Sequence, residues 1–157
     1  MEFCLITIGK TKTPWIQTGI AEYMKRLKNY VSFQLVELPD LKSTKSLSED
    51  QQKQKEGEAI LSKLTAADFL VLLDEHGREY TSMEFASYIE KLMASGKKRV
   101  AFAVGGPYGF SPAVYDRANA KLSLSKMTFS HEMVRAFFVE QLYRAQTILR
   151  GEPYHHE

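Results

Sequence analysis

Residues 101–112 read AFAVGGPYGFSP, and this stretch changes from a run typical of a buried strand to a turn with few side chains. Gly105, Gly106 and Gly109 leave much of the main chain bare. Glycine is needed where a turn is tight, and also where a ligand lies directly against the backbone. Both explanations are open when the stretch is considered alone.

Outward from this stretch, the apolar residues alternate between a period of two and a period of 3.6, which is typical of alternating strands and helices. Strands are expected at 2–8, 31–38, 68–74, 99–104 and near 121–125. Helices are expected from Pro14 to about Asn29, at about 49–64, at about 82–94, from about Ser111, and from after Ser130 to Gly151. This order predicts an α/β fold with a mostly parallel sheet and helices on both faces.

Polar residues and glycines predict several helix ends. Thr13 is expected to be the N-cap of the first helix, because the proline that follows it fits the first helical position. Ser48 is a possible cap of the second helix, and the polar stretch 40–57 is expected to be a mobile loop that runs into this helix. Gly151 is expected to end the last helix.

Two of the expected strands end in marked turns, LLDEHG at 72–77 and VGGPYG at 104–109. The carboxyl ends of parallel strands meet at one edge of a sheet, and ligands bind beyond that edge. The two turns therefore predict a ligand site there. Glycines also follow strands for purely structural reasons, so either turn alone leaves that alternative open.

The last helix carries two apolar stripes on opposite sides. One stripe is Val134, Phe138, Leu142, Ala145 and Leu149, and the other is Ala136, Val139 and Tyr143. A helix that is apolar on two sides is expected to be buried on two sides. The second side is expected to contact a twin subunit through an isologous interface, unless an inserted segment covers it.

The composition is that of a soluble globule, and the length of 157 residues predicts one domain over residues 1–157. The net charge of +2 means that a nucleic-acid partner would require a local basic patch. The single cysteine, Cys4, lies in an apolar run and excludes an internal disulfide or a multi-cysteine metal site. No run approaches the ~18 apolar residues of a membrane span, so a cytoplasmic protein is expected.

Several common sites are excluded by their missing residues. GGPYG lacks the lysine and serine or threonine of a P-loop, and it is not a dinucleotide fingerprint. No serine lies in the G-x-S-x-G context of a hydrolase. No metal is expected, because His76 is isolated, His131 opens a helix, and the adjacent histidines 155 and 156 lack companions at ligand spacing. A site built largely from main-chain groups remains, which suits a flat heterocycle.

Several longer stretches resemble one family. They are VGGPYGFSP (104–112), LSLSKMTFSHEMVRAFFVEQLYRAQTILRGEPYHHE (122–157), ITIGKTK (6–12) and the W-x-x-x-G-x-x-E-Y pattern that begins at Trp15. Together they resemble the ribosomal RNA large subunit methyltransferase H family, small members of the SPOUT superfamily. The resemblance extends from the start of the chain to its last residues, and its C-terminal third is the most specific part.

The resemblance implies a fold, an activity and partners. In this family, the C-terminus of the chain threads the sheet and forms a deep trefoil knot, which creates the pocket for S-adenosylmethionine. The proteins are homodimers with an active site across the dimer interface. They methylate N3 of pseudouridine 1915 in the helix 69 loop of 23S rRNA, and the assembled ribosome is the expected substrate. No membrane or metal partner is implied.

The resemblance also assigns cofactor-binding residues. They are Leu73, Gly105, Leu124, Ser125, Lys126, Met127, Thr128 and Phe129. The residues themselves suit this role, because Leu73 supplies an apolar wall and Gly105 lets a ligand approach the backbone. The segment 124–129 offers N–H and C=O groups to adenine. On this interpretation the bare glycine turn is a requirement of the cofactor.

Three residues are expected to act in catalysis: His155 and Tyr154 in the tail, and Arg144 in the last helix. Methyl transfer requires a deprotonated imide nitrogen in line with the methyl carbon. His155 is expected to take the proton, Tyr154 to stack on the base or hydrogen-bond it, and Arg144 to hold a phosphate or balance the anion. A frayed tail and a solvated arginine are the bland alternatives.

Basic residues near the first and last helices are candidates for RNA contact: Lys10, Lys12, Lys25, Arg26, Lys28, Arg144 and Arg150. The sequence departs from the family at Ser130, where proline is common, and at His156, where lysine or arginine is common. Ser130 is expected to cap the last helix, with Glu132 favourable against the helix dipole.

Other functions are open from the sequence alone. One is a SPOUT methyltransferase that acts on transfer RNA or on another ribosomal site. A second is a non-catalytic ribosome-binding factor that retains the cofactor fold.

Overall fold

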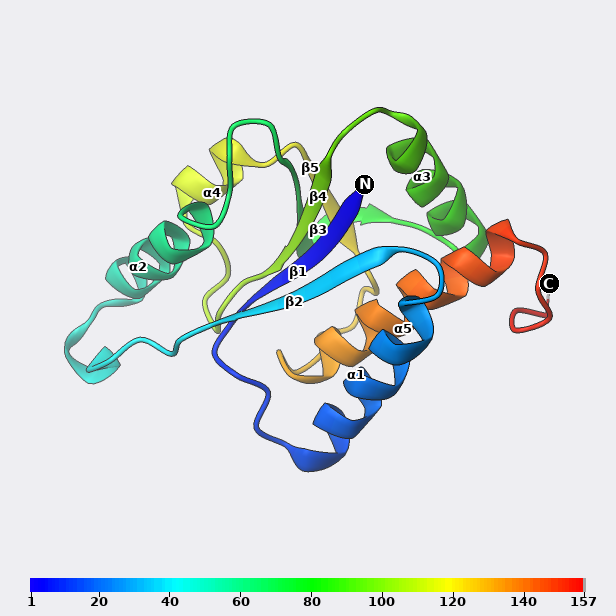
Figure 1. Ribbon diagram of the computed structural model, residues 1–157. Coiled ribbons are helices and arrows are strands. Elements are labelled where there is room, and N and C mark those ends of the chain that lie inside the picture. The colour runs from blue at the N-terminus through cyan, green and yellow to red at the C-terminus, as the bar shows by residue number, and fades with distance from the viewer. Residues whose placement is uncertain (157) are drawn as a thin grey trace.

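The computed structural model describes residues 1–156, which form a five-stranded sheet with helices on both faces (Figure 1). The strands are β1 (Glu2–Ile8), β2 (Ser32–Leu38), β3 (Phe69–Glu79), β4 (Arg99–Val104) and β5 (Ala120–Ser123). The helices are α1 (Pro14–Leu27), α2 (Glu49–Leu61), α3 (Ser82–Ala94), α4 (Pro112–Arg117) and α5 (Met133–Leu149), with a short 3₁₀ helix η1 (Thr44–Ser46) before α2.

The sheet order is β2-β1-β4-β3-β5, and every neighbouring pair is parallel. Helices α1, α3 and α5 pack on one face of the sheet, and α2 and α4 pack on the other (Figure 1). This arrangement confirms the predicted α/β fold. It also brings the carboxyl ends of β3, β4 and β5 to one edge, where the turns identified in the sequence lie.

The central strands are buried on both faces, which is why they are apolar without interruption. In β1, Phe3 and Leu5 pack in the core under α1, α3 and α5, whereas Cys4 and Ile6 pack in the core under α2 and α4. Cys4 is completely buried, as expected for a small core residue.

Helix α5 lies between α1 and α3, and both neighbours belong to the same chain. The ring of Phe138 meets Phe85 of α3 at 6.4 Å between ring centroids. On the other side, the ring of Tyr143 meets Tyr23 of α1 and Tyr30 just beyond it, each at 5.8 Å. Helix α1 therefore covers the second stripe at Tyr143. The prediction that a twin subunit covers this stripe is wrong at that residue.

Strand β3 is longer than the sequence indicated. Leu73 and Arg78 both pair with Leu122 of β5, so residues 74–77 bulge out of the ladder instead of forming the turn expected after 74. A Cβ at Gly77 would lie 2.6 Å from the backbone nitrogen of Leu122. The close approach of two main chains therefore explains this glycine.

The helix ends follow the predictions, with one exception. Ser48 and Thr81 each form a capping box, and the Ser130 hydroxyl accepts a bond of 3.1 Å from the Met133 N–H. Thr13 precedes α1 but its side chain makes no capping bond. Instead, the carboxylate of Glu132 accepts hydrogen bonds from the N–H of Thr13 at 2.9 Å and of Lys12 at 3.1 Å. A carboxylate from the far end of the chain thus caps α1.

The polar stretch 40–57 is only partly a loop, because η1 lies within it and α2 begins at Glu49. No helix within residues 1–156 combines the length and the apolar character needed to cross a bilayer.

Two glycines should respond to alanine in opposite directions. Gly77→Ala should lower the free energy of unfolding by about 1–3 kcal/mol or more, because its Cβ would push against the backbone of β5. Gly19→Ala is the matched control in α1, where no atom lies within 4 Å of the added Cβ, and it should raise the free energy of unfolding by about 0.5–1 kcal/mol. Urea titrations measure both values, and an unchanged midpoint for Gly77→Ala would contradict the packing described for the bulge.

Candidate functional site

A cavity of about 680 Å³ opens at the carboxyl ends of β3, β4 and β5. Its walls come from the β3 bulge, the glycine turn after β4, and the segment between β5 and α5. The volume is in the range of small-molecule sites. The edge predicted from the two sequence motifs therefore does hold a cavity.

Most of the residues expected to bind a cofactor are brought together in this cavity. Those that line it are Leu73, Gly105, Leu124, Ser125, Met127, Thr128 and Phe129. Lys126 is not among the lining residues, because its side chain is 86% exposed and its Nζ atom lies 4.0 Å from a carboxylate oxygen of Glu79. The cavity thus includes most of the segment 124–129, whereas the side chain of Lys126 lies toward Glu79.

The glycines after β4 are required by the protein itself. A Cβ on Gly105 would lie 3.2 Å from the carbonyl group of Gly109, whose φ of +84° suits glycine. A Cβ on Gly106 would lie 2.4 Å from both carboxylate oxygens of Glu56. The interpretation that the cofactor alone requires a bare turn is therefore incomplete, since the turn is also tight and closely packed.

Glu56 is a buried acid that sequence reasoning missed. It projects from α2 beneath the glycine turn and is 4% exposed. Its Oε2 atom accepts a bond of 3.3 Å from Gln52, whereas Oε1 has no hydrogen-bond partner among residues 1–156. Burial raises the pKa of Glu56 above its ordinary value. Nothing in the polar sequence of α2 distinguishes this glutamate from its neighbours.

A second acid, Asp74, stands on the cavity wall directly after Leu73. Its Oδ2 atom accepts a short hydrogen bond from the Tyr115 hydroxyl, and its Oδ1 atom accepts the N–H of His76 at 2.8 Å. Burial acts to raise the pKa of Asp74, but these hydrogen bonds hold it below the ordinary value. Burial and the bond to Asp74 raise the pKa of Tyr115 to about 12. Asp74 is therefore ionised.

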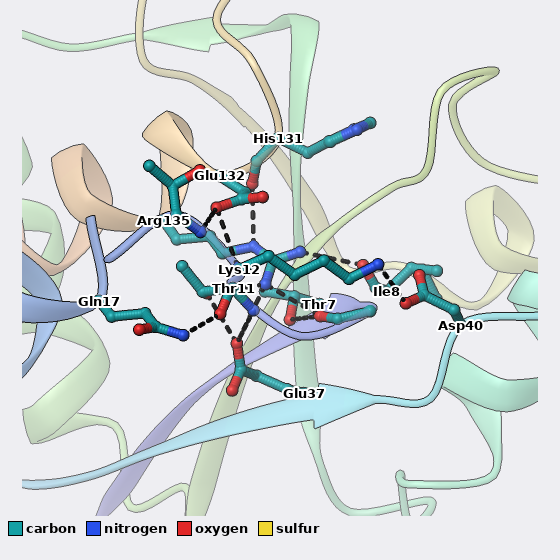
Figure 2. Close-up of polar contacts among 12 residues, drawn as sticks. Thr7, Ile8, Thr11, Lys12, Gln17, Glu37, Asp40, His131, Glu132 and Arg135 are labelled. Carbon is teal, nitrogen blue, oxygen red and sulfur yellow. Dashed lines mark hydrogen bonds and ion pairs between the residues drawn. The ribbon is translucent and has the colours of Figure 1, made fainter. Parts of the chain in front are cut away.

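Arg135 joins the start of α5 to the loop after β1 (Figure 2). Its side chain is 2% exposed. One terminal nitrogen, Nη1, donates to the carbonyl of Gly9 at 2.9 Å, to the hydroxyl of Thr11 at 3.0 Å and to the carboxylate of Glu37 at 3.1 Å. The other, Nη2, donates to the carbonyl of Ile8 at 2.9 Å.

The same arginine fixes the end of the cavity-lining segment. Its Nε atom donates to the carbonyl of His131 at 2.9 Å, and His131 lines the cavity. The neighbouring Glu132 accepts hydrogen bonds from the N–H groups of Lys12 and Thr13, and Figure 2 shows the contact with Lys12. The cavity wall and the loop after β1 are thus held together by Glu132 and Arg135, which lie three residues apart at the start of α5.

The three residues expected to act in catalysis lie together in a different place. Nη1 of Arg144 is 3.0 Å from Nδ1 of His155, and its guanidinium also binds the carboxylate of Glu140. The hydroxyl of Tyr154 donates to Glu140 at 2.9 Å and lies 3.1 Å from the hydroxyl of Tyr23. These bonds argue against a frayed tail and a solvated arginine. Nothing in the sequence indicated the part played by Glu140.

The tail cluster and the cavity lie at opposite ends of α5. Val134 lines the cavity, and Arg144 follows ten residues later, which corresponds to about 15 Å along a helix. Of the described residues that line the cavity, none is Arg144, Tyr154 or His155. One chain alone therefore does not combine the two sets of predicted site residues.

The candidate RNA-binding residues differ in their surroundings. Lys12 pairs with Asp40 at 3.3 Å, Arg26 pairs with Glu22 at 3.0 Å, and Arg150 stacks on the ring of Tyr30 at 4.5 Å. Lys25 and Lys28 line an open groove together with Tyr30 and Phe33. Within residues 1–156 there is no cluster of three or more His, Cys, Asp and Glu side chains that could hold a metal ion.

Comparison with known proteins gives consistent matches along the chain. Residues 1–155 match a family model described as "Predicted SPOUT methyltransferase". The chain is 57% identical to "Ribosomal RNA large subunit methyltransferase H" of Parabacteroides distasonis and 57% identical to the protein of the same name from Flavobacterium johnsoniae. It is 55% identical to that of Phocaeicola vulgatus. All three matches cover 100% of both chains.

The buried acid beneath the glycine turn should make stability depend on pH. Because the pKa of Glu56 is raised in the folded state, the unfolded chain ionises first, and the free energy of unfolding should fall as pH rises above the unfolded value of about 4.3. Glu56→Gln should remove this part of the pH dependence and gain stability relative to the unmodified protein as pH rises. Urea titrations from pH 4 to pH 8 measure this pH dependence of the free energy of unfolding. Glu58→Gln, at an exposed position on the same helix, is the control. Parallel curves for Glu56→Gln and the unmodified protein would refute the raised pKa.

Proposed function

The chain belongs to the SPOUT methyltransferase family, and from its full-length similarity to ribosomal RNA large subunit methyltransferases H we propose that it methylates ribosomal RNA of the large subunit, with S-adenosylmethionine as donor. The finer proposal is transfer to N3 of pseudouridine 1915 in the helix 69 loop of 23S rRNA, within the assembled ribosome of the cytoplasm. We further propose that residues 1–157 form one SPOUT domain with the trefoil knot of the family. The observation that carries the proposal is the cavity at the carboxyl edge, walled by the segments that the family resemblance singled out.

The residues of the cavity fit the donor. Leu73 and Phe129 offer apolar surface, the glycine turn offers main-chain groups, and Asp74 offers an anion. A cavity of about 680 Å³ is large enough for a nucleoside with an amino-acid tail. When bound, S-adenosylmethionine supplies an activated methyl group on a positively charged sulfur. We propose that Leu73, Gly105 and the segment 124–129 hold it.

The hydrogen bond to Arg144 alters the role first expected for His155. A guanidinium only donates hydrogen bonds, so Nδ1 of His155 is the acceptor and the neutral ring carries its proton on Nε2. We propose that this Nε2–H and the guanidinium stabilise the negative charge on the imide of the target base, while its N3 proton passes to solvent. The guanidinium of Arg144 lies over the ring of Tyr154 at 4.6 Å, so we propose that Tyr154 supports the position of Arg144 beside the base.

The separation of the two sets of residues supports a homodimer. A complete site would need the cavity of one chain and the tail of another, which a two-fold axis near the middle of α5 provides. The exposed Phe137 lies in the first half of α5, with its ring tilted against that of Phe129 at 4.9 Å between centroids, beside a crevice of about 160 Å³ that includes Tyr80 and Phe85. We propose that this surface is the dimer interface, in place of the Tyr143 stripe.

The proposed activity is tested by transfer of labelled methyl from S-adenosylmethionine to ribosomal particles, with the product nucleotide identified by mass spectrometry. His155→Ala should lower the rate about 100-fold, because a donor to the developing anion is lost. Its affinity for S-adenosylmethionine, measured by calorimetry, should stay within about twofold, because His155 is proposed to contact the target base and not the donor. His156→Ala is the matched control and should retain the rate. Normal turnover of His155→Ala would remove His155 from the site, and absence of any transfer would favour a non-catalytic ribosome-binding factor.

The shared site is tested by mixing two inactive variants. Gly105→Val disturbs the cavity and His155→Ala disturbs the tail, so each homodimer should be inactive. After random exchange, about half of the dimers are heterodimers, and each heterodimer has one site in which an intact cavity faces an intact tail. About a quarter of the normal activity should therefore return. Native mass spectrometry confirms the exchange, and heterodimers without activity would contradict a site shared between subunits.

A further inference from the structure

Asp74 is the most unusual charged group on the cavity wall. Its side chain is only 7% exposed, although it lies in the bulge that interrupts the pairing of β3 with β5. It follows Leu73 directly, so its carboxylate borders the surface proposed for the donor. A carboxylate removed from water in this way costs free energy unless the protein or a ligand compensates it.

The groups around Asp74 hold it in place without neutralising it. The Tyr115 hydroxyl and the backbone N–H of His76 are neutral donors. The imidazole of His76 lies 3.4 Å from Oδ1, but its side chain is 80% exposed to solvent. Lys121 lies over the ring of Tyr115 at 5.7 Å, and Glu75 adds a further negative charge to the wall. No lysine or arginine among residues 1–156 forms an ion pair with Asp74.

The cavity wall therefore carries an oriented negative charge at Asp74. Two hydrogen bonds occupy part of the acceptor capacity of Asp74, and a carboxylate has about four acceptor positions in total. An oriented anion on a cavity wall attracts a cation more strongly than a neutral molecule of the same shape. This inference rests on the proposed function, in which the donor is a cation and the product that must leave is neutral at sulfur.

We propose that Asp74, held by Tyr115 and His76, makes the cavity select the positively charged S-adenosylmethionine over the neutral product S-adenosylhomocysteine. The interaction is strongest before transfer and weakens once the charge has been lost. It therefore serves binding of the donor and release of the product, and it does not accelerate the chemical step.

The selection is measured by calorimetric titration of the unmodified protein and Asp74→Asn with S-adenosylmethionine and with S-adenosylhomocysteine. Asp74→Asn should bind S-adenosylmethionine about tenfold more weakly and S-adenosylhomocysteine within about twofold of the unmodified affinity. The loss for S-adenosylmethionine should shrink at high salt. Turnover assays should show the same change in KM for the donor with little change in kcat.

Asp116→Asn is the control, because it removes one negative charge from an exposed position on α4 that does not line the cavity. It should leave both affinities unchanged. Tyr115→Phe keeps the ionised acid but removes one of its donors, and should retain selectivity for the charged ligand. Melting curves check that each variant is folded.

The outcomes separate the two proposals. Equal losses for both ligands in Asp74→Asn would mean that Asp74 binds a part that the two ligands share, either the nucleoside or the ammonium group, and would overturn the selection by the charge on sulfur. Unchanged affinities would overturn any contact. An unmodified protein that binds neither ligand would overturn the proposed function, and this inference with it.

Discussion

The fold depends on the burial of one guanidinium. Arg135 lies out of water, so each of its donors must meet an acceptor, and the acceptors come from β1, the loop after it, β2 and the segment before α5. Removal of one member of such a buried pair costs about 3–5 kcal/mol, because the other charge is left alone. The requirement fixes how four separate segments meet. The far end of the cavity wall is fixed with them through the carbonyl of His131.

The cavity is built to keep its shape without a ligand. In the glycine turn, Gly105 packs closely against the backbone of Gly109, and Gly106 packs against the carboxylate of Glu56. Gly77 in the β3 bulge packs against the backbone of Leu122. The acid on its wall is oriented by a tyrosine and a backbone N–H. A site that is already oriented loses less free energy on binding than one that must be ordered first. Packing within the protein thus restricts which residues fit at positions 105 and 106.

The sequence predicted those parts of the fold whose causes are local. β1, β4 and α3 have the expected bounds, because apolar runs and capping residues define them. The sequence did not predict that β3 continues through polar residues 74–77, since its far part is held by β5, nor that Glu132 caps a helix more than a hundred residues away. The distance between the cavity and the tail is predictable from the sequence, because ten residues of one helix separate Val134 from Arg144.

The bonds of Arg135 have a consequence for the order of folding. Four of them join residues that are 98 to 127 positions apart in the chain, and the contact of Glu132 with Thr13 joins residues 119 apart. Contacts of such long range form late, because a large loop must close before they contribute any stability. During translation, the loop after β1 must wait for α5 to emerge before it acquires its partners. A nascent chain thus cannot form these bonds, or the part of the cavity wall that they hold, until Arg135 has been synthesised.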